Sequence, residues 1–229
     1  MISIAIDGPS GAGKSTVAKK CAERFGFRYV DTGAIYRTIG LAAFNRGIDT
    51  KDSATVVSIL PELDIDLIYN ENGEQRMILN GSDVSEEIRR PEISMCASNV
   101  SAIAAVRDYL TDMQRNMAKR YDVIMDGRDI GTVILPNADV KVFLTASAEA
   151  RADRRYKELI KKGSKISYDE VLSDMKLRDE QDTKRDAAPL KAAEDAVYLD
   201  TSAMSFDESV DAVAKLIVER TGRAPKLEQ

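Results

Sequence analysis

Short apolar runs alternate with longer amphipathic stretches along this chain. Four of the runs are too short for helices and are bounded by turn residues, which predicts strands at 2–6, 123–125, 140–144 and 196–199. Helical spacing follows the first run, where Val17, Cys21 and Phe25 share one face and Gly26 ends the segment. Uninterrupted apolar strands separated by helices are typical of a parallel sheet covered on both faces. The pattern therefore predicts one α/β domain over residues 1–229.

Two later helices carry recognisable start signals. Ser167 stands three residues before Glu170, and Ser205 stands three residues before Glu208, so each pair has the sequence of a capping box. Residues 221–229 follow the second of these helices, and we expect a flexible tail there.

The stretch between residues 63 and 88 breaks the alternation of strands and helices. Two apolar runs there are separated by Asn72-Gly73 and followed by Asn80-Gly81. Asn-Gly pairs are strong signals for tight turns between antiparallel strands. We therefore expect a small antiparallel, β-rich insertion within the α/β core.

Composition narrows the class of protein. The chain has 229 residues, of which 44% are hydrophobic and 31% charged, with a net charge of −5. That is enough apolar material for one core, and no tail of a single charge sign suggests a nucleic-acid or membrane partner. No apolar run approaches the length of a membrane span, and the first residues do not resemble a signal peptide. We expect a cytoplasmic protein, with a monomer as the default.

Cysteine and histidine usage excludes several kinds of chemistry. Cys21 and Cys96 have neither the spacing of metal ligands nor that of a disulfide framework, and Cys21 is expected to be a buried free thiol. The chain contains no histidine. Histidine-based triads, histidine metal sites and imidazole general bases are therefore all excluded.

A glycine-rich segment follows the first predicted strand and precedes the first predicted helix. It matches Gly-x-x-x-x-Gly-Lys-Ser in full, with the residues Gly8, Pro9, Ser10, Gly11, Ala12, Gly13, Lys14 and Ser15, and with Thr16 next. In this context backbone N–H groups and the helix N-terminus cradle a nucleotide phosphate. Lys14 is expected to reach the β- and γ-phosphates of ATP, and Ser15 to offer its hydroxyl to Mg²⁺. The segment thus predicts a P-loop that binds ATP with magnesium.

The P-loop alone does not select a reaction, because switches, motors and kinases share it. A GTP-binding switch usually carries an Asn-Lys-x-Asp guanine reader, and no asparagine in this chain is followed by lysine. Motors and assembly ATPases usually have longer chains. A small-molecule kinase fits this length best.

Arginines follow two strand candidates. The segment 31–37, just after a second strand candidate that follows the first helix, ends in Arg37, and the segment 126–132, directly after the strand at 123–125, contains Arg128. Ligands of α/β folds bind at the carboxyl ends of parallel strands, and the guanidinium fork suits phosphate geometry. We expect Arg37 and Arg128 to bind the phosphate of an acceptor substrate.

A third cluster consists of Arg178, Asp182 and Arg185. Their spacing of four and then three residues would place them on one helical face, where they could bind substrate or form a structural ion-pair ladder. Phosphoryl transfer depends on positioning and on cations around the shared phosphate. A phosphate acceptor is already an anion, so a chain without histidine can perform this transfer.

Together these motifs resemble those of bacterial cytidylate kinases, members of the nucleoside monophosphate kinase family. The similar segments are 6–15, 31–37, 126–133 and 178–185. The insertion near 63–88 is also similar to the enlarged acceptor-binding region of the bacterial form. The resemblance implies a P-loop kinase fold with a central five-stranded parallel sheet flanked by helices. It also implies an acceptor-binding region at about 31–110 and a short lid at about 150–170.

The same resemblance implies a reaction and a set of site residues. ATP would transfer its γ-phosphoryl group to CMP or dCMP, with Mg²⁺ as cofactor, in pyrimidine metabolism. The catalytic residues would be Lys14, Arg128, Arg154, Arg155 and Arg178, with Arg154 and Arg155 in the lid beside Arg151. The acceptor site would consist of Thr32, Arg37, Ser98, Arg107, Arg128, Asp129, Arg178, Asp182 and Arg185. Some relatives carry an additional arginine where this chain has Gln181 and Thr183.

Cytosine recognition has a physical rationale in these residues. A carboxylate such as Asp129 can accept from the N4 amino group, while Arg107 and Ser98 can donate to N3 and O2. Uracil would turn its O4 acceptor towards the carboxylate, a mismatch of roughly 1–3 kcal/mol. The alternative for Asp129 is an ion pair that only braces Arg128.

Two other functions stay open from the residues alone. One is a different P-loop small-molecule kinase, such as adenylate, thymidylate or dephospho-coenzyme A kinase. The other is a nucleotide-dependent switch, which the missing guanine reader and the arginine clusters disfavour.

Overall fold

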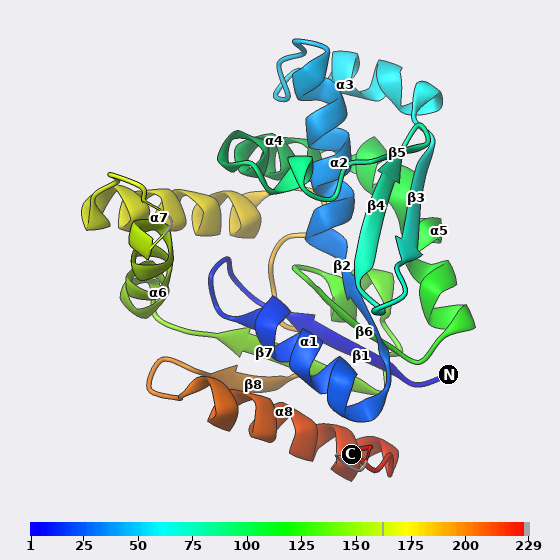
Figure 1. The fold of residues 1–229 in the computed structure, drawn as a ribbon, viewed down its shortest axis with the longest axis vertical. Coiled ribbons are helices and arrows are strands. Elements are labelled where there is room, and N and C mark those ends of the chain that lie inside the picture. Colours follow the sequence, from blue (N-terminus) through cyan, green and yellow to red (C-terminus); the bar gives the residue numbers. More distant parts are fainter. Residues whose placement is uncertain (162, 227–229) are drawn as a thin grey trace.

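A five-stranded parallel sheet forms the centre of the computed structural model, which describes residues 1–161 and 163–226 (Figure 1). Its strands are β1 (Ser3–Asp7), β2 (Arg28–Asp31), β6 (Val123–Gly127), β7 (Val140–Thr145) and β8 (Val197–Asp200). They lie in the order β2-β6-β1-β7-β8, and every neighbouring pair is parallel. The four predicted apolar runs became β1, β6, β7 and β8, with ends that differ by at most two residues.

Helices cover both faces of this sheet. One face packs against α1 (Lys14–Phe25) and α8 (Phe206–Thr221). The other packs against α2 (Thr32–Asn45), α4 (Pro91–Ser101) and α5 (Ala104–Arg120). Each face has its own apolar cluster. Within β1, Ile4 and Ile6 belong to the cluster that includes α1 and α8, Ala5 belongs to the cluster that includes α2, α4 and α5, and all three are fully buried. Burial on both faces explains why the strands are continuous apolar runs.

The predicted capping boxes are confirmed. Ser167 caps α7 (Tyr168–Lys184) and Ser205 caps α8, each with the reciprocal bonds to Glu170 and Glu208. Helix α8 ends at Thr221 with Gly222 as its C-cap, so the helix runs one residue into the expected tail. The amide of Lys226 donates to a carbonyl of α1, while residues 227–229 lie outside the described residues.

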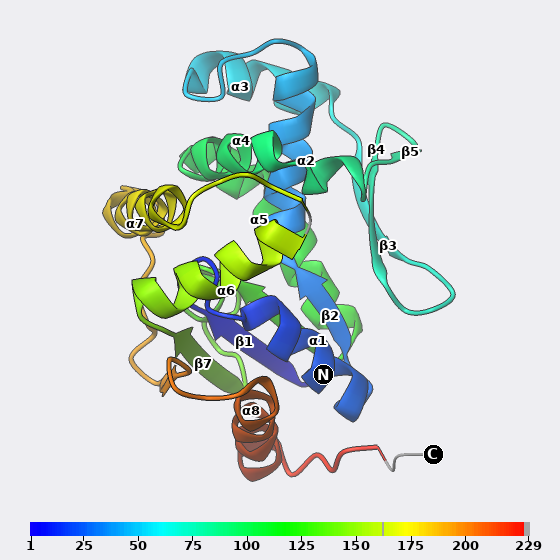
Figure 2. The same ribbon diagram turned by 60° about the vertical axis from the view of Figure 1, so that its left-hand side comes forward.

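The expected insertion is an antiparallel sheet of β3 (Ile65–Tyr69), β4 (Gln75–Leu79) and β5 (Ser82–Asp83), which extends beside the core in Figure 2. Asn80 and Gly81 have φ of 50° and 79°, as a two-residue type I′ turn requires. The hydroxyl of Tyr69 donates to the carbonyl of Tyr29 at 2.9 Å. Short helices flank the sheet: α3 (Ser53–Ile59), η1 (Leu60–Glu62) and η2 (Glu87–Arg89).

Helices α6 (Ala148–Lys161) and α7 form a hairpin beside the sheet (Figure 1). The hairpin has a small apolar cluster of its own around Ala152, Val171 and Met175. It contains the segment expected to be a lid. Helix α7 ends at Lys184, so Arg185 adopts extended backbone just beyond the helix. The expectation that Arg178, Asp182 and Arg185 share one helical face was wrong at its last residue.

Two further features concern membrane-spanning segments and thiols. Among the helices of the described residues, none combines the length and apolar character that crossing a bilayer requires. Cys21 is a fully buried free thiol in α1, as expected, and Cys96 is a half-buried free thiol in α4.

Candidate active site

The P-loop joins the end of β1 to the start of α1. Gly8, Gly11 and Gly13 have φ of 147°, 75° and 90°, a region that glycine enters without strain. A Cβ on Gly8 would lie 1.9 Å from the carbonyl oxygen of Leu144 in β7. The loop therefore needs glycine both for its dihedral angles and for its close approach to the sheet.

Lys14 lies inside this loop, at the first position of α1. Its side chain is buried, and its Nζ donates to the carbonyl of Pro9 at 2.7 Å. Burial, followed by the nearby positive charge of Arg128, lowers the pKa of Lys14 to about 7, against the opposing effect of Asp126. The nearby carboxylates do not offset the cost of burying the ammonium group of Lys14. An incoming anion such as a phosphate would therefore stabilise its charged form.

Asp126 joins the P-loop to β6. Its carboxylate accepts from the hydroxyl of Ser15 at 2.8 Å and from that of Tyr29 at 2.7 Å. Burial, and then the charge of Asp31, raise the pKa of Asp126. Sequence reasoning did not assign Asp126 to the site, although an acidic residue at the end of an apolar strand was the available signal.

Ser15 and Asp126 suit a magnesium ion that arrives with a nucleotide. Both offer hard oxygen donors, which Mg²⁺ prefers. Within residues 1–161 and 163–226 no group of three or more acidic, cysteine or histidine side chains is arranged to hold a metal ion. Mg²⁺ usually keeps several waters and takes phosphate oxygens as ligands, so two protein oxygens are a sufficient set.

A cavity of about 230 Å³ opens between the P-loop and the helices above it. All nine residues expected for the acceptor site line this cavity: Thr32, Arg37, Ser98, Arg107, Arg128, Asp129, Arg178, Asp182 and Arg185. Ser10, Gly11, Lys14 and Ser15 of the P-loop line it as well. The cavity lies at the carboxyl ends of the parallel strands β1, β2 and β6, where the segments that follow these strands begin.

One part of the cavity wall is a buried cluster around Asp129. Nη2 of Arg107 donates to Oδ2 of Asp129, and Nη2 of Arg185 lies 3.7 Å from Oδ1. Arg107 also donates to the carbonyl of Ser101 at 3.0 Å. Nη2 of Arg185 makes no hydrogen bond among the described residues. One carboxylate thus lies between two buried guanidinium groups, one of which has an unused donor.

Another part of the wall carries unneutralised arginines. In the structure as described, no carboxylate forms an ion pair with Arg37 or Arg178, and Nε of Arg178 is buried without a hydrogen bond. Burial lowers the pKa of both guanidinium groups, Asp31 opposes this at Arg37 and Asp174 at Arg178, and the charge of Arg128 lowers both further. Adjacent cations that have no ion-pair partner in the described residues favour an anionic ligand such as phosphate.

Asp182 holds the third of these arginines. Nε of Arg128 donates to Oδ2 of Asp182 at 2.6 Å, and Nη1 of Arg185 lies 3.9 Å from Oδ1. The alternative that Asp129 braces Arg128 was therefore wrong, because Asp182 occupies that position. The alternative of an ion-pair ladder from Arg178 through Asp182 to Arg185 was also wrong at its first step. Among the residues that the structure describes, no ion pair joins Arg178 to Asp182. Ser98 donates to Oε1 of Gln181 at 3.3 Å.

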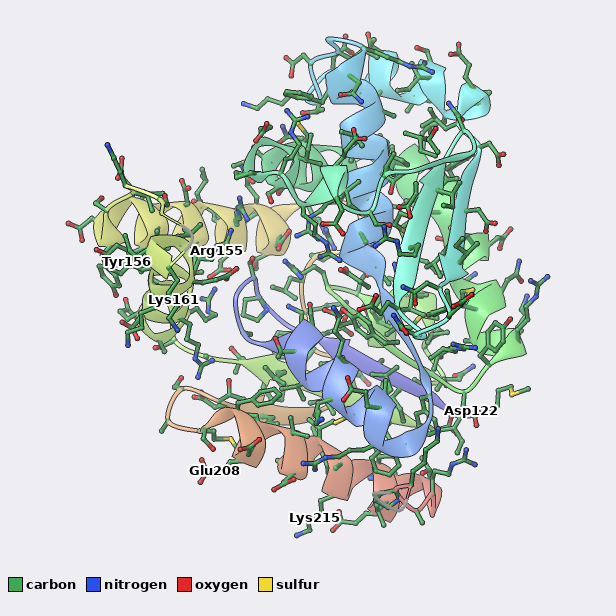
Figure 3. The ribbon with its side chains drawn as sticks, in the orientation of Figure 1. Asp122, Arg155, Tyr156, Lys161, Glu208 and Lys215 are labelled. Atoms are coloured by element: carbon green, nitrogen blue, oxygen red, sulfur yellow. The ribbon has the colours of Figure 1, made fainter. Side chains whose placement is uncertain are left out.

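A second cavity, of about 300 Å³, lies between the P-loop and α6. It is lined by Gly11, Gly13, Lys14, Ser15, Thr16, Arg151, Arg154, Arg155 and Glu158. Gly8, Pro9 and Ala12 line neither of these two cavities. In Figure 3 Arg155 lies on the side of α6 towards the centre of the molecule, and Tyr156 on the outer side.

The three arginines of α6 have different surroundings. Arg151 is buried and donates to the carbonyl of Ser10 at 2.9 Å and to the carboxylate of Asp179 at 2.6 Å. Arg154 donates to the carbonyl of Thr201, and Arg155 pairs with Glu158 at 2.8 Å near the surface. Arg151 therefore ties the P-loop to α7, a role that sequence reasoning did not identify.

Comparisons with known proteins agree over almost the whole chain. A family model described as "Cytidylate kinase" matches residues 4–219. The protein called cytidylate kinase in Caldicellulosiruptor bescii is 49% identical over 215 residues, which are 94% of this chain and 95% of that protein. Its counterpart in Geobacter sulfurreducens is 47% identical over 222 residues, 97% and 95% of the two chains. An uncharacterized protein from Eubacterium ventriosum has a similar structure, with a TM-score of 0.52, 14% identity, and coverage of 96% and 99%. This last likeness concerns the fold alone.

Proposed function

The chain belongs to the cytidylate kinase family, and we propose that it transfers the γ-phosphoryl group of ATP to CMP or dCMP, giving ADP and CDP or dCDP. The observation that carries this proposal is the single cavity in which P-loop residues and all nine expected acceptor residues meet. Lys14 lines the acceptor cavity and the second cavity alike, so it stands where a donor and an acceptor nucleotide would meet.

Within the acceptor cavity the phosphate of CMP belongs beside Arg37, Arg128 and Arg178. Two of these guanidinium groups have no carboxylate partner in the described part of the chain, and Arg128 is oriented by Asp182. A dianionic phosphate supplies the missing negative charge, and each charge-assisted hydrogen bond is stronger than a neutral one.

The cytosine belongs beside Asp129. Arg107 and Arg185 lie on either side of the Asp129 carboxylate, whose oxygens would accept from the N4 amino group. The unused Nη2 of Arg185 can donate to the remaining base edge, and the hydroxyl of Ser98 can donate to it or accept from it. Uracil would place its O4 against the same carboxylate, so we expect CMP to be preferred over UMP.

The donor nucleotide belongs in the second cavity. The backbone of the P-loop binds its phosphates, Lys14 stabilises the charge on the transferring group, and Arg154 and Arg155 approach from α6. Magnesium, held with the nucleotide by Ser15 and supported by Asp126, would neutralise charge on the β- and γ-phosphates. The acceptor phosphate needs no general base, since it is already an anion.

A coupled ADP-release assay across all nucleoside monophosphates tests this function. With ATP and Mg²⁺, CMP and dCMP should stimulate ADP release well above UMP, AMP, GMP and dTMP. Greater stimulation by a purine nucleotide or by dTMP would assign the chain to a different acceptor. Slow release that no acceptor stimulates would indicate a nucleotide switch.

A further inference from the structure

A buried carboxylate contacts the backbone of the segment that directly follows Asp129. Asp7 is the last residue of β1 and immediately precedes the P-loop, and it is only 4% exposed. Its Oδ1 accepts from the amide of Ile130 and its Oδ2 from the amide of Gly131, both at 2.7 Å. These two bonds connect residues more than 120 positions apart in the chain.

The two amides belong to the segment that follows Asp129. They open the short π-helical turn η3 (Ile130–Ile134), and the carbonyl of Asp129 accepts from the amide of Val133 at 2.8 Å. The backbone of Asp129 is therefore fixed by η3 on one side and by β6 on the other. Asp7 holds the first two residues of that turn, which directly follow Asp129.

Gly131 is shaped for this contact. A Cβ at position 131 would lie 3.3 Å from Oδ2 of Asp7 and 3.2 Å from Cδ of Lys141. Such separations are tighter than most real Cβ contacts, so a larger residue would push the carboxylate away. The glycine lets Asp7 reach two successive amides.

A charge at this place is unfavourable in itself. Burial raises the pKa of Asp7 to about 6, the two backbone bonds oppose that effect, and the negative charge of Asp129 adds to it. An apolar side chain would fill the space without this desolvation, but it would leave two amides unsatisfied. Two N–H groups at one fixed distance require an acceptor with two oxygens, as a carboxylate has.

We propose that Asp7 is a positioning residue for base selection: without touching the substrate, it fixes the 129–131 backbone and thereby aims the Asp129 carboxylate at the base. The proposal rests on the proposed function, because it assigns a cause to the orientation of the residue that reads cytosine. It also connects the two halves of the site, since Asp7 directly precedes the P-loop that would bind ATP.

The test is the variant Asp7→Asn, assayed with CMP and UMP at varied ATP. Asparagine keeps the shape but offers one acceptor and turns an N–H donor towards an amide donor. We expect KM for CMP to rise and the CMP-to-UMP ratio of kcat/KM to fall roughly tenfold. KM for ATP should stay within about twofold of wild type, since the P-loop keeps its own bonds.

A second variant and a control make the outcome decisive. Gly131→Ala crowds Oδ2 of Asp7 from the other side, so it should lower the same ratio even if Asp7→Asn fails to fold. Asp139→Asn is the matched control, because Asp139 accepts from the amide of Ser3 at 2.7 Å at the opposite end of β1. It should leave the ratio unchanged.

Equal losses with CMP and UMP, a rise in KM for ATP, or an unchanged ratio in both variants would overturn the positioning role. The wild-type enzyme in the same assay reports on the proposed function separately. If wild type shows no preference for CMP, the acceptor assignment fails before any variant is considered.

Discussion

Nε of Arg128 donates to Oδ2 of Asp182 at 2.6 Å, across 54 residues of sequence. The bond joins the loop after β6 to α7, and so it holds two walls of the acceptor cavity together. Burial disfavours the charged form of Arg128, but the carboxylates of Asp182, Asp126 and Asp179 together outweigh burial and raise its pKa. Asp182 therefore orients Arg128 before a phosphate arrives.

The variant Asp182→Asn should release that orientation. A charge-assisted hydrogen bond is worth about 1.5–3 kcal/mol, so kcat/KM for CMP should fall about tenfold to a hundredfold. The matched control is Glu180→Gln on the same helix, because Glu180 is exposed and pairs only with Lys184 among the described residues. If steady-state kinetics give the two variants the same kcat/KM, Arg128 does not depend on Asp182.

Lys14→Ala should lower kcat by about a hundredfold or more, since a charge placed at the transferring phosphate contributes several kcal/mol. Binding of CMP, followed by calorimetry, should change little because other residues hold its phosphate and base. Lys20→Ala is the control, since Lys20 lies on the same helix but is exposed and pairs with Glu23. Near-normal turnover in a folded Lys14→Ala variant would contradict the P-loop mechanism.

Asp129→Asn should change which pyrimidine is preferred. The amide keeps the volume and presents a donor to O4 of uracil, so the CMP-to-UMP ratio of kcat/KM should fall by roughly tenfold or more, equivalent to about 1.4 kcal/mol. Activity with CMP should fall as well. Both kcat/KM values need to be measured on the folded variant.

The same substitution also leaves Arg107 and Arg185 less neutralised, because Asp129 is their shared partner. Loss of one buried partner destabilises a fold by about 3–5 kcal/mol, so thermal unfolding of the variant should be recorded alongside the kinetics. Reduced rates for both substrates at an unchanged ratio would mean that Asp129 serves only to hold the two arginines.

The free energy of unfolding should depend on pH through the protonation of Asp7. Its folded-state pKa of about 6 lies above the ordinary value of 3.8, so the folded state binds more protons between these pH values. Stability from this group is greatest at low pH and is lost as pH rises towards 6. Relative to Asp7→Asn, wild type should lose about 2 kcal/mol between pH 4.5 and 6.5 in urea titrations. Parallel pH curves for the two proteins would refute the raised pKa.

Local patterns predicted most of the fold. Continuous apolar runs gave four strands because both faces of the sheet are covered, and Asn80-Gly81 gave a hairpin because only small, turn-forming residues accept two positive φ values. The capping boxes of α7 and α8 were correct since they depend on side chains three residues apart. The end of α7 was misjudged, because nothing in the local sequence before Arg185 marks the exit from the helix.

The set of site residues was predictable, but their pairing was not. Loops at the carboxyl ends of adjacent parallel strands must come together, so Arg37 and Arg128 line one cavity with the P-loop. Which carboxylate orients Arg128 depends on how α7 packs against α6 and α4, and sequence spacing carries no information about that. For the same reason the contacts of Asp7 and Arg151 became visible only in the structure. The roles of these side chains in substrate binding stay predictions.

The two cysteines differ in a way that matters for labelling the unmodified protein. Burial raises the pKa of the Cys21 thiol to about 12, so it stays protonated and shielded from alkylating reagents. Cys96 is half-buried on α4, in the helix that also carries Ser98 of the acceptor cavity. A thiol-reactive fluorophore should therefore attach at this one position. The native chain thus provides a single-site optical reporter for movement of the acceptor-binding region, with no cysteine to remove.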